Sequence, residues 1–237
     1  AARGALQRVR HYPSLPGSAL GDCMKRALLL ATLLLSAQAI QAAEPAKAEA
    51  TNKPDAAAGQ AIVGKVCVSC HGANGNSVVP ANPKLAGQFP EYLEKQMNNF
   101  KQVNGKAERN SPVMMGFAAT LSPADVRNVA AYLSSQAPKP GTARNKDTIV
   151  LGQKLWRGGD VSRGIPACAS CHGANGAGVP VQYPRLAGQQ AEYVETQLKA
   201  FRSGERANDS NRMMRAFAVK LSDAEIKAVA DYAAGLK

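Results

Sequence analysis

Two five-residue segments hold most of the side chains in this sequence that could bind a prosthetic group. Cys67–His71 reads Cys-Val-Ser-Cys-His, and Cys168–His172 reads Cys-Ala-Ser-Cys-His. Two cysteines three residues apart lie on one helical turn, so both thiols can bond the vinyl groups of one porphyrin while the adjacent His binds its iron. This spacing is the attachment signature of c-type haem. It predicts two covalently bound haems with iron, attached through Cys67, Cys70, Cys168 and Cys171.

Other uses of a Cys-x-x-Cys pair fit the sequence less well. A thioredoxin-like redox pair belongs with alternating strands and helices, which the flanking sequence lacks. A zinc site needs further Cys or His ligands. Only His11 and Cys23 are left outside the two segments, and both lie in an N-terminal stretch that we expect to be absent from the working protein.

The N-terminal stretch resembles a secretory signal. Met24, Lys25 and Arg26 precede an apolar run, residues 27–35, and small residues follow at positions 36–42. A short basic segment, a short apolar run and small residues are typical of a signal peptide over residues 24–42. We interpret residues 1–23 as a non-native upstream extension and expect the exported chain to begin between Ala39 and Glu44. A retained membrane anchor is the alternative, although the run is short for a bilayer span. Export predicts a periplasmic protein. It also fits haem attachment, because c-type haem is attached outside the bacterial cytoplasm, where free thiols would otherwise risk oxidation.

The rest of the chain is one domain repeated. His71-Gly72-Ala73-Asn74-Gly75 matches the segment from His172 at an offset of 101, and residues 83–88 match residues 184–189. Further along, the offset becomes 100. A repeat of about 100 residues predicts two duplicated domains rather than a solenoid. We place domain 1 at residues 55–136 and domain 2 at residues 148–237. The Pro/Gly-containing residues 137–147 read as a linker.

Helix signals recur in both domains, and no stretch alternates like a strand. An all-α fold of two tandem domains is therefore expected. Asp55, Thr148, Ser122 and Ser222 are N-cap candidates, and Ser222 with Glu225 forms a capping-box pattern. The expected helices are 56–66, 90–100, 123–135, 149–157 (ended by Gly158-Gly159), 191–201 and 223–234. Domains of this size often need an additional stabilising element, which a covalent porphyrin would supply.

The axial ligands of each iron can be chosen by counting. His71 and His172 occupy one side, and no other histidine follows residue 42. A methionine is the usual partner of His in c-type haem. Met114 and Met214 coincide in the repeat, each seven residues before the Leu-Ser of the last helix, so we expect them to be the second ligands. Met115 and Met213 are the alternatives, and both pairs could instead be apolar lining. Met97 aligns with Leu198 and reads as core filling.

Charge favours an acidic partner. Residues 43–237 hold 24 Lys and Arg against 16 Asp and Glu, a formal charge of +8 before haem carboxylates. A basic surface accelerates encounters with acidic proteins. We expect no nucleic-acid partner, because the charges are scattered and an exported haem protein rarely meets DNA.

The repeated motifs give the chain a family resemblance over residues 55–237. The two haem motifs, the Pro-Lys/Arg-Leu-Ala-Gly-Gln segments and the Met-x-x-Phe-Ala-x-x-Leu-Ser segments resemble dihaem cytochromes c of the cytochrome c4 family. The resemblance implies two class I cytochrome c domains related by a pseudo-twofold axis. It also implies a periplasmic or loosely membrane-associated protein that carries electrons towards terminal oxidases. Pro83 and Pro184, twelve residues after each motif His, are implied acceptors of a hydrogen bond from the imidazole.

Other side chains are candidates for contacts with the haem edges or carboxylates. These are Tyr92, Gln96, Trp156, Arg157, Tyr193 and Gln197. For Trp156 and the two tyrosines, packing against haem or helix is the preferred interpretation. For Arg157, solvation competes equally with binding a haem carboxylate.

His/Met ligation fills both axial positions, which leaves no place for a substrate. The sequence therefore predicts a one-electron carrier and not an enzyme, with no catalytic residues. The expected donor is a cytochrome bc complex and the expected acceptor a haem-copper oxidase. A fixed haem subunit of a dehydrogenase or oxidase complex is the alternative. A dihaem peroxidase is disfavoured, because it needs an openable haem and a further His.

Overall fold

The computed structural model describes residues 53–237. The predicted upstream extension and signal peptide, with His11 and Cys23, lie outside the described residues. Within residues 53–237, no helix is both long and apolar enough to cross a membrane.

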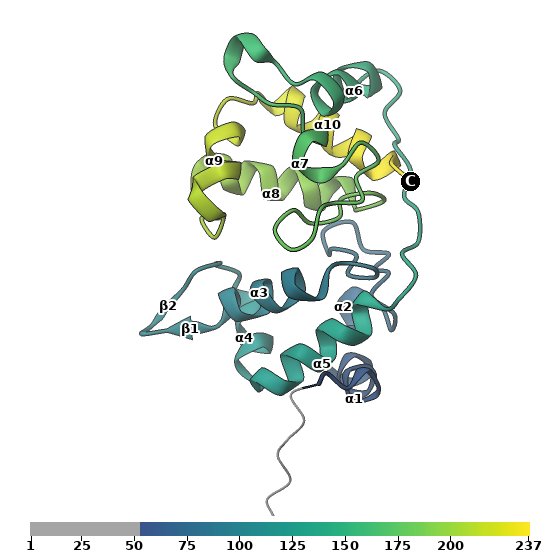
Figure 1. Ribbon diagram of the computed structural model, residues 1–237, viewed down its shortest axis with the longest axis vertical. Helices are drawn as coiled ribbons and strands as arrows, with labels where there is room; N and C mark the ends of the chain where they lie inside the picture. Colours follow the sequence, from purple (N-terminus) through teal and green to yellow (C-terminus); the bar gives the residue numbers. More distant parts are fainter. Residues whose placement is uncertain (1–52) are drawn as a thin grey trace, which may run out of the picture. The chain divides into compact units, whose positions relative to one another are not determined.

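Domain 1 is built from short helices arranged around one core (Figure 1). Along the chain they are α1 (Ala56–Ile62), a π-helical turn (Val63–Cys67), α2 (Val68–His71), α3 (Pro90–Phe100), α4 (Pro112–Ala119) and α5 (Pro123–Ser134). Helices α1 and α3 both pack on α5. The core contains Val63, Leu93, Val129, Tyr132 and Leu133.

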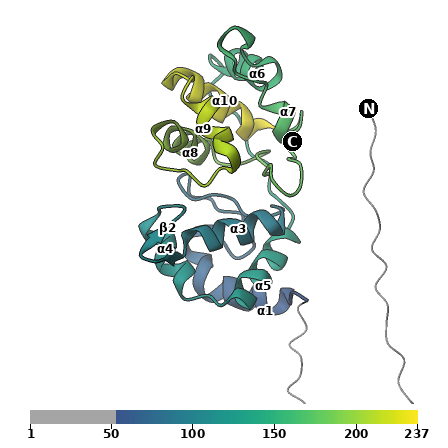
Figure 2. The ribbon, with the colours of Figure 1, turned by 60° about the vertical axis from the view of Figure 1, so that its left-hand side comes forward.

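Domain 2 repeats this plan, but a longer connection separates α6 from α7, the helix that carries the cysteine motif (Figures 1 and 2). Its helices are α6 (Ile149–Gly158), a 3₁₀ turn (Val161–Arg163), α7 (Ala169–His172), α8 (Ala191–Ser203), a 3₁₀ turn (Ser210–Arg212), α9 (Met213–Ala218) and α10 (Asp223–Gly235). Helices α6 and α8 both pack on α10. The two tandem, helical domains confirm the expected fold class.

Most of the expected helix ends are confirmed. Asp55 Oδ1 accepts hydrogen bonds from the backbone N–H groups of Ala57 and Ala58, at 2.8 and 3.1 Å. Ser222 and Glu225 form the predicted capping box. Thr148 occupies the predicted N-cap position, but the expected capping bond is absent: its side chain caps no N–H, and its hydroxyl donates to the carbonyl oxygen of Asn145 at 3.3 Å instead. The first helix also widens into the π turn at Val63 rather than continuing as an α-helix to residue 66.

A small hairpin departs from the all-helical expectation. Strands β1 (Gln102–Val103) and β2 (Lys106–Ala107) pair antiparallel. Asn104 and Gly105 connect them with φ values of 53° and 77°. Asn-Gly is the typical sequence of a two-residue hairpin turn, which needs positive φ at both positions. The hairpin is too short to show strand alternation, so only the dipeptide could have revealed it.

Glycines allow the first and last helices of each domain to approach closely. A Cβ on Gly59 would lie 2.0 Å from the carbonyl oxygen of Asn128 on α5. A Cβ on Gly152 would lie 2.4 Å from the carbonyl oxygen of Ala228 on α10. Real Cβ atoms do not approach backbone oxygens so closely, so only glycine fits either crossing. These crossings fix the helices that lead into the two cysteine motifs.

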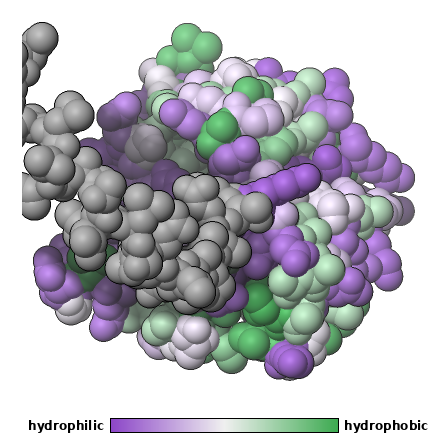
Figure 3. Space-filling model, turned by 60° about the horizontal axis from the view of Figure 1, so that its bottom comes forward, coloured by the Kyte–Doolittle hydropathy of each residue, from purple (hydrophilic) through white to green (hydrophobic). Residues whose placement is uncertain are grey.

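The face shown in Figure 3 has hydrophilic groups interspersed with small apolar ones. Several of the exposed apolar side chains flank the cysteine and methionine segments of domain 1. Val68 is 38% exposed, Phe117 40% and Val113 65%. The Val68 and Phe117 counterparts in domain 2, Ala169 and Phe217, are half-buried.

Candidate haem-binding sites

Each cysteine motif lies on a single turn of helix. In domain 1 the π turn ends at Cys67, and α2 carries Cys70 and His71. In domain 2 α7 carries Cys171 and His172, with Cys168 at its N-cap. All four cysteines are free thiols and half-buried. The structure therefore places both thiols of each pair beside their histidine, as the spacing predicted.

The two imidazoles are held in the same way. His71 Nδ1 lies 3.0 Å from the carbonyl oxygen of Pro83, and His172 Nδ1 lies 3.0 Å from that of Pro184. A carbonyl oxygen can only accept, so each Nδ1 carries a proton and donates it. The lone pair of Nε2 is then free to bind a metal, with the ring orientation fixed by the proline. The hydrogen bonds implied by the family resemblance are thus confirmed.

Burial shifts the pKa values of the motif histidines and cysteines. Each histidine is 8% exposed, and burial lowers the pKa of His71 and His172, with the bond to proline opposing this shift. Both imidazoles are therefore neutral near pH 7, the form that binds metals. Burial raises the pKa of Cys168 to about 11 and also raises the pKa of Cys67. Reactive redox cysteines have lowered pKa values, so these thiols do not resemble a thioredoxin-type pair.

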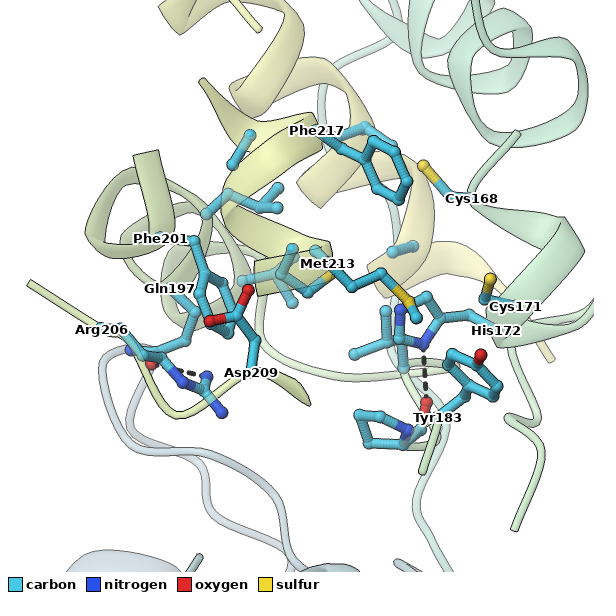
Figure 4. A pocket seen from close by; sticks show the side chains of 18 of the residues that line it. Cys168, Cys171, His172, Tyr183, Gln197, Phe201, Arg206, Asp209, Met213 and Phe217 are labelled. Atoms are coloured by element: carbon cyan, nitrogen blue, oxygen red, sulfur yellow. Dashed lines mark hydrogen bonds between the residues drawn. The ribbon is translucent and has the colours of Figure 1, made fainter. Parts of the chain in front are cut away.

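A large cavity in domain 2 opens between the cysteine motif and α9 (Figure 4). Cys168, Cys171 and His172 lie on one side of it. Apolar and aromatic side chains form much of the rest. They include Trp156, Ile165, Leu186, Val194, Leu198, Phe201, Phe217, Leu221 and Val229. Such a lining suits a flat, apolar ligand.

Both candidate methionines of domain 2 line the same cavity. Met213 and Met214 are consecutive on α9, and Figure 4 shows Met213 extending into the space that His172 also faces. In domain 1, Met114 and Met115 are consecutive on α4 and both half-buried. The choice of Met114 and Met214 as iron ligands stays a prediction that rests on the repeat register.

One aromatic and one basic candidate, Trp156 and Arg157, contact other residues of domain 2. Trp156 is 1% exposed, and its Nε1 donates to the carbonyl oxygen of Ala174 at 3.1 Å. Its ring centroid lies 6.4 Å from that of His172. Trp156 therefore packs beside the motif histidine His172, in line with the preferred packing interpretation. Arg157 is exposed and donates to the hydroxyl of Tyr232 at 3.2 Å.

A buried arginine of domain 1 reaches into domain 2. Arg109 is 8% exposed and stacks on Phe100, with Cζ 4.7 Å from the ring centroid. Its guanidinium donates to Gln96 Oε1 of its own domain at 2.8 Å. It also donates to the hydroxyl of Tyr193 at 2.9 Å and to Gln197 Oε1 at 2.8 Å, both on α8 of domain 2.

Arg206 makes the reciprocal contacts from domain 2. It is 8% exposed, and its Cζ lies 4.4 Å from the centroid of Phe201. It donates to Gln197 Oε1 of its own domain at 2.9 Å. Across the interface it donates to the hydroxyl of Tyr92 at 3.2 Å and to Gln96 Oε1 at 3.1 Å, both on α3. The tyrosines and glutamines proposed to reach a haem line the domain 2 cavity, and through the two arginines they also join α3 to α8 by hydrogen bonds.

Sequence reasoning missed this arginine pair. The two residues are 97 apart, whereas the repeat offset is 101 before the loop and 100 after it. The hairpin in domain 1 and the 3₁₀ turn in domain 2 shift the register between them. Their equivalence is clear from backbone contacts, since Arg109 N donates to Asn99 O and Arg206 N donates to Ala200 O. Asn99 and Ala200 are 101 apart.

A second reciprocal contact joins the domains near the two prolines. Gln88 Nε2 donates to Arg185 O at 3.0 Å, and Gln88 Oε1 accepts from Arg185 N at 3.0 Å. Gln189 Nε2 donates to Lys84 O at 2.9 Å, and Gln189 Oε1 accepts from Lys84 N at 2.8 Å. Each glutamine is 101 residues from the other, as are Lys84 and Arg185. The two domains are therefore related across this contact by an approximate twofold axis.

The donor set and the cavity fit a covalently attached haem. Two thiols can form the thioether bonds, and an oriented neutral imidazole and a thioether sulfur can bind the iron. The apolar walls can cover the macrocycle. Among residues 53–237, no cluster of three or more Cys, His, Asp and Glu side chains could hold a separate metal ion. A zinc site of that kind is therefore absent from the described part of the chain.

Comparisons with known proteins agree with this chemistry. The sequence matches the family model described as cytochrome c twice, over residues 56–137 and 149–237. It is 44% identical to cytochrome c4 of Thiocapsa roseopersicina over 192 residues, which is 80% of this chain and 97% of that protein. It is 37% identical to the thiosulfate dehydrogenase electron acceptor of Thiomonas intermedia (strain K12) over 217 residues, 89% of this chain and 91% of that one.

Among solved structures, the fold matches reduced recombinant cytochrome c4 from Pseudomonas stutzeri with a TM-score of 0.73. The sequence identity is 41%, and the match covers 78% of this chain and all of that one. The duplicated site, its donor atoms and these matches together establish two covalently bound haem c groups, one in each domain, called haem 1 and haem 2 below.

Proposed function

Because the chain belongs to the cytochrome c4 family of dihaem cytochromes, we propose that it carries single electrons in the periplasm from a cytochrome bc complex to a haem-copper oxidase. Family membership makes it a dihaem electron carrier. The compartment, the two partners and the lack of any catalytic turnover are the proposal.

The main support is the arrangement of His172 and the methionines of α9 around one cavity. A haem with His on one side and Met on the other has no position left for oxygen, peroxide or another substrate. The haem supplies the one-electron chemistry. The chain orients the imidazole through Pro184, excludes water with apolar walls, and keeps the imidazole neutral through burial.

Carbon monoxide provides the sharpest test of this closed site. The reduced protein should bind carbon monoxide slowly and partially, because binding must displace a methionine, and it should not turn over peroxide. Fast carbon monoxide binding at one haem together with peroxidase activity would favour the enzyme interpretation. Electron transfer to a purified haem-copper oxidase should be fast and should slow as salt screens the basic surface.

A second donor is favoured by one group of relatives. Proteins named thiosulfate dehydrogenase electron acceptor, from Thiomonas intermedia and Stutzerimonas stutzeri, are 37% and 38% identical to this chain. A thiosulfate dehydrogenase is therefore the alternative electron donor. Stopped-flow reduction of the oxidised protein by each purified donor would decide between them. Isolation of the protein only within a larger complex would favour a fixed haem subunit over a mobile carrier.

A further inference from the structure

The linker, residues 137–147, runs from α5 to α6 (Figure 1), and each of its ends is bonded to one domain. At the first end, the side chain of Asn76 in domain 1 bonds the linker backbone twice. Its Nδ2 donates to the carbonyl oxygen of Ala137 at 3.0 Å, and its Oδ1 accepts from the N–H of Lys139 at 2.7 Å. Asn76 is 7% exposed, so the linker supplies the hydrogen bonds that this buried amide needs.

The second end is bonded by Asp231 of α10 in domain 2. Its Oδ1 accepts from the N–H of Arg144 at 2.9 Å, and its Oδ2 accepts from the N–H of Asn145 at 3.0 Å. Asp231 is 8% exposed and belongs to none of the ion pairs between described residues. A buried carboxylate is costly unless donors satisfy it. The linker N–H groups are therefore the partners that stabilise this carboxylate in α10.

These two residues depart from the repeat. Asn76 corresponds to Ala177 at the offset of 101, and Asp231 corresponds to Ala131 at the offset of 100. Each domain thus has a buried polar side chain where the other has alanine. The chain has two haem motifs but only one linker, so a residue that holds the linker is needed in one copy only. The departure from the repeat and the contacts with the linker identify the same two residues.

The two attachments shorten the free part of the linker. Only residues 140–143 remain between Lys139 and Arg144. Within them, a Cβ on Gly141 would lie 2.4 Å from the carbonyl oxygen of Ala234, so the linker also packs on the end of α10. Glutamine, tyrosine and arginine side chains join the domains by hydrogen bonds, and a polar interface between domains allows relative motion. A short, fixed connection opposes this motion by keeping the two surfaces at high effective concentration.

We propose that Asn76 and Asp231 are positioning residues, which fasten the linker and thereby hold the two haem domains at a fixed separation. Electron exchange between haem 1 and haem 2 depends on that separation, because electron transfer slows steeply as two cofactors move apart. The exchange moves one electron from a reduced iron to an oxidised iron, and no proton or bond changes place. Such positioning requires only the two haems, whatever the compartment and partners of the proposed carrier.

Alanine substitutions test the attachments directly, since alanine is the residue that the other domain has at each position. Asp231→Ala should speed hydrogen exchange at the amides of Arg144 and Asn145 roughly tenfold or more, because a buried hydrogen bond is lost at each. Asn76→Ala should have the same effect on the amide of Lys139. Residue-resolved NMR of the holoprotein measures these rates. Exchange in the middle of α5 and α10 should stay unchanged, which shows that the domains themselves remain folded.

The double variant Asn76→Ala/Asp231→Ala tests the consequence for the haems. Exchange NMR of the half-reduced protein gives the rate of electron exchange, and the part that is independent of protein concentration occurs within one molecule. This intramolecular rate should fall roughly two- to tenfold, because loosened domains spend less time at their closest approach. The optical spectra of both haems should stay unchanged, which distinguishes altered positioning from damage to a haem site.

Two further variants are controls. Thr142→Ala removes an exposed hydroxyl from the same linker and should change neither hydrogen exchange nor electron exchange. Asp231→Asn keeps the size of the side chain but can accept through one oxygen only, so its effects should lie between those of wild type and Asp231→Ala. Asp231→Asn also replaces Asp231→Ala in both measurements if the alanine variant fails to fold.

Two outcomes would overturn the proposal. One is wild-type hydrogen exchange of the linker amides in either single variant. The other is a wild-type rate of electron exchange in the double variant although its linker amides exchange faster. Neither outcome would affect the proposed carrier function, which is tested separately by carbon monoxide binding and by electron transfer to partners.

Discussion

Replacing Gly152 by Ala should destabilise domain 2 even though alanine is the better helix former. The exchange gains about 1 kcal/mol of helix propensity. The new Cβ, however, would lie 2.4 Å from the carbonyl oxygen of Ala228 and 2.7 Å from the Cβ of Tyr232. Neither atom can rotate away, so α6 and α10 must separate. Overpacking of this kind costs about 1–3 kcal/mol, and the rigid backbone contact puts it near the upper limit. The expected net loss is about 2 kcal/mol.

The control lies in the same helix. A Cβ on Gly158, at the end of α6, would have no atom within 4 Å, so Gly158→Ala should be neutral or stabilise by up to about 1 kcal/mol. Guanidinium unfolding of the holoprotein, followed by far-ultraviolet circular dichroism and by the haem absorption, measures both variants. Wild-type stability of Gly152→Ala, or a shift of the unfolding midpoint in the same direction for both variants, would refute the role of the close helix crossing.

Three further expectations follow from the haem sites and one helix cap. Met114→Ala and Met214→Ala should each remove about half of the ferric iron–thioether charge-transfer band; loss of that band with Met115→Ala instead would contradict the repeat register. The intact mass should exceed that of the polypeptide by two haems, and Cys171→Ala should impair attachment at one site only. Arg163 lowers the pKa of Glu225 to about 2 from 4.5, so the Glu225 carboxylate stabilises the fold above pH 4.5, and this contribution is lost as the pH falls towards 2. Acid unfolding of Glu225→Gln should therefore be less steep in that range, and an unchanged profile would show that the cap contributes little.

The sequence predicted the elements whose signals are local. Ser222 with Glu225 identified a helix start, and Pro90–Phe100 was bounded correctly by the helical spacing of its side chains. The Cys-x-x-Cys-His spacing placed both thiols and the imidazole on one turn. The sequence also placed Thr148 at the start of its helix, but not the bond of its side chain, because its hydroxyl donates to the carbonyl oxygen of Asn145 just upstream.

What depends on contacts between domains could not be read from the chain. Arg109 and Arg206 face each other's helices only after both domains fold, and insertions around them hide their equivalence. Tyr92 and Tyr193 were recognised as candidates for the haem surroundings, and both line the haem 2 cavity; their hydroxyls also accept hydrogen bonds from the arginine of the opposite domain. No local pattern shows that a tyrosine beside a haem cavity also contacts the neighbouring domain.

The paired glutamines have a consequence for the ancestry of the molecule. Gln88 bonds the backbone of Arg185 and Gln189 bonds the backbone of Lys84, so equivalent surfaces of the two domains contact each other. Contacts of this kind join two identical subunits in a symmetric homodimer. A single-domain ancestor could thus have assembled through this surface before its gene was duplicated and fused. After fusion the two copies no longer had to be identical. Domain 1 has Lys95 where domain 2 has Thr196, a difference that two identical subunits could never have had.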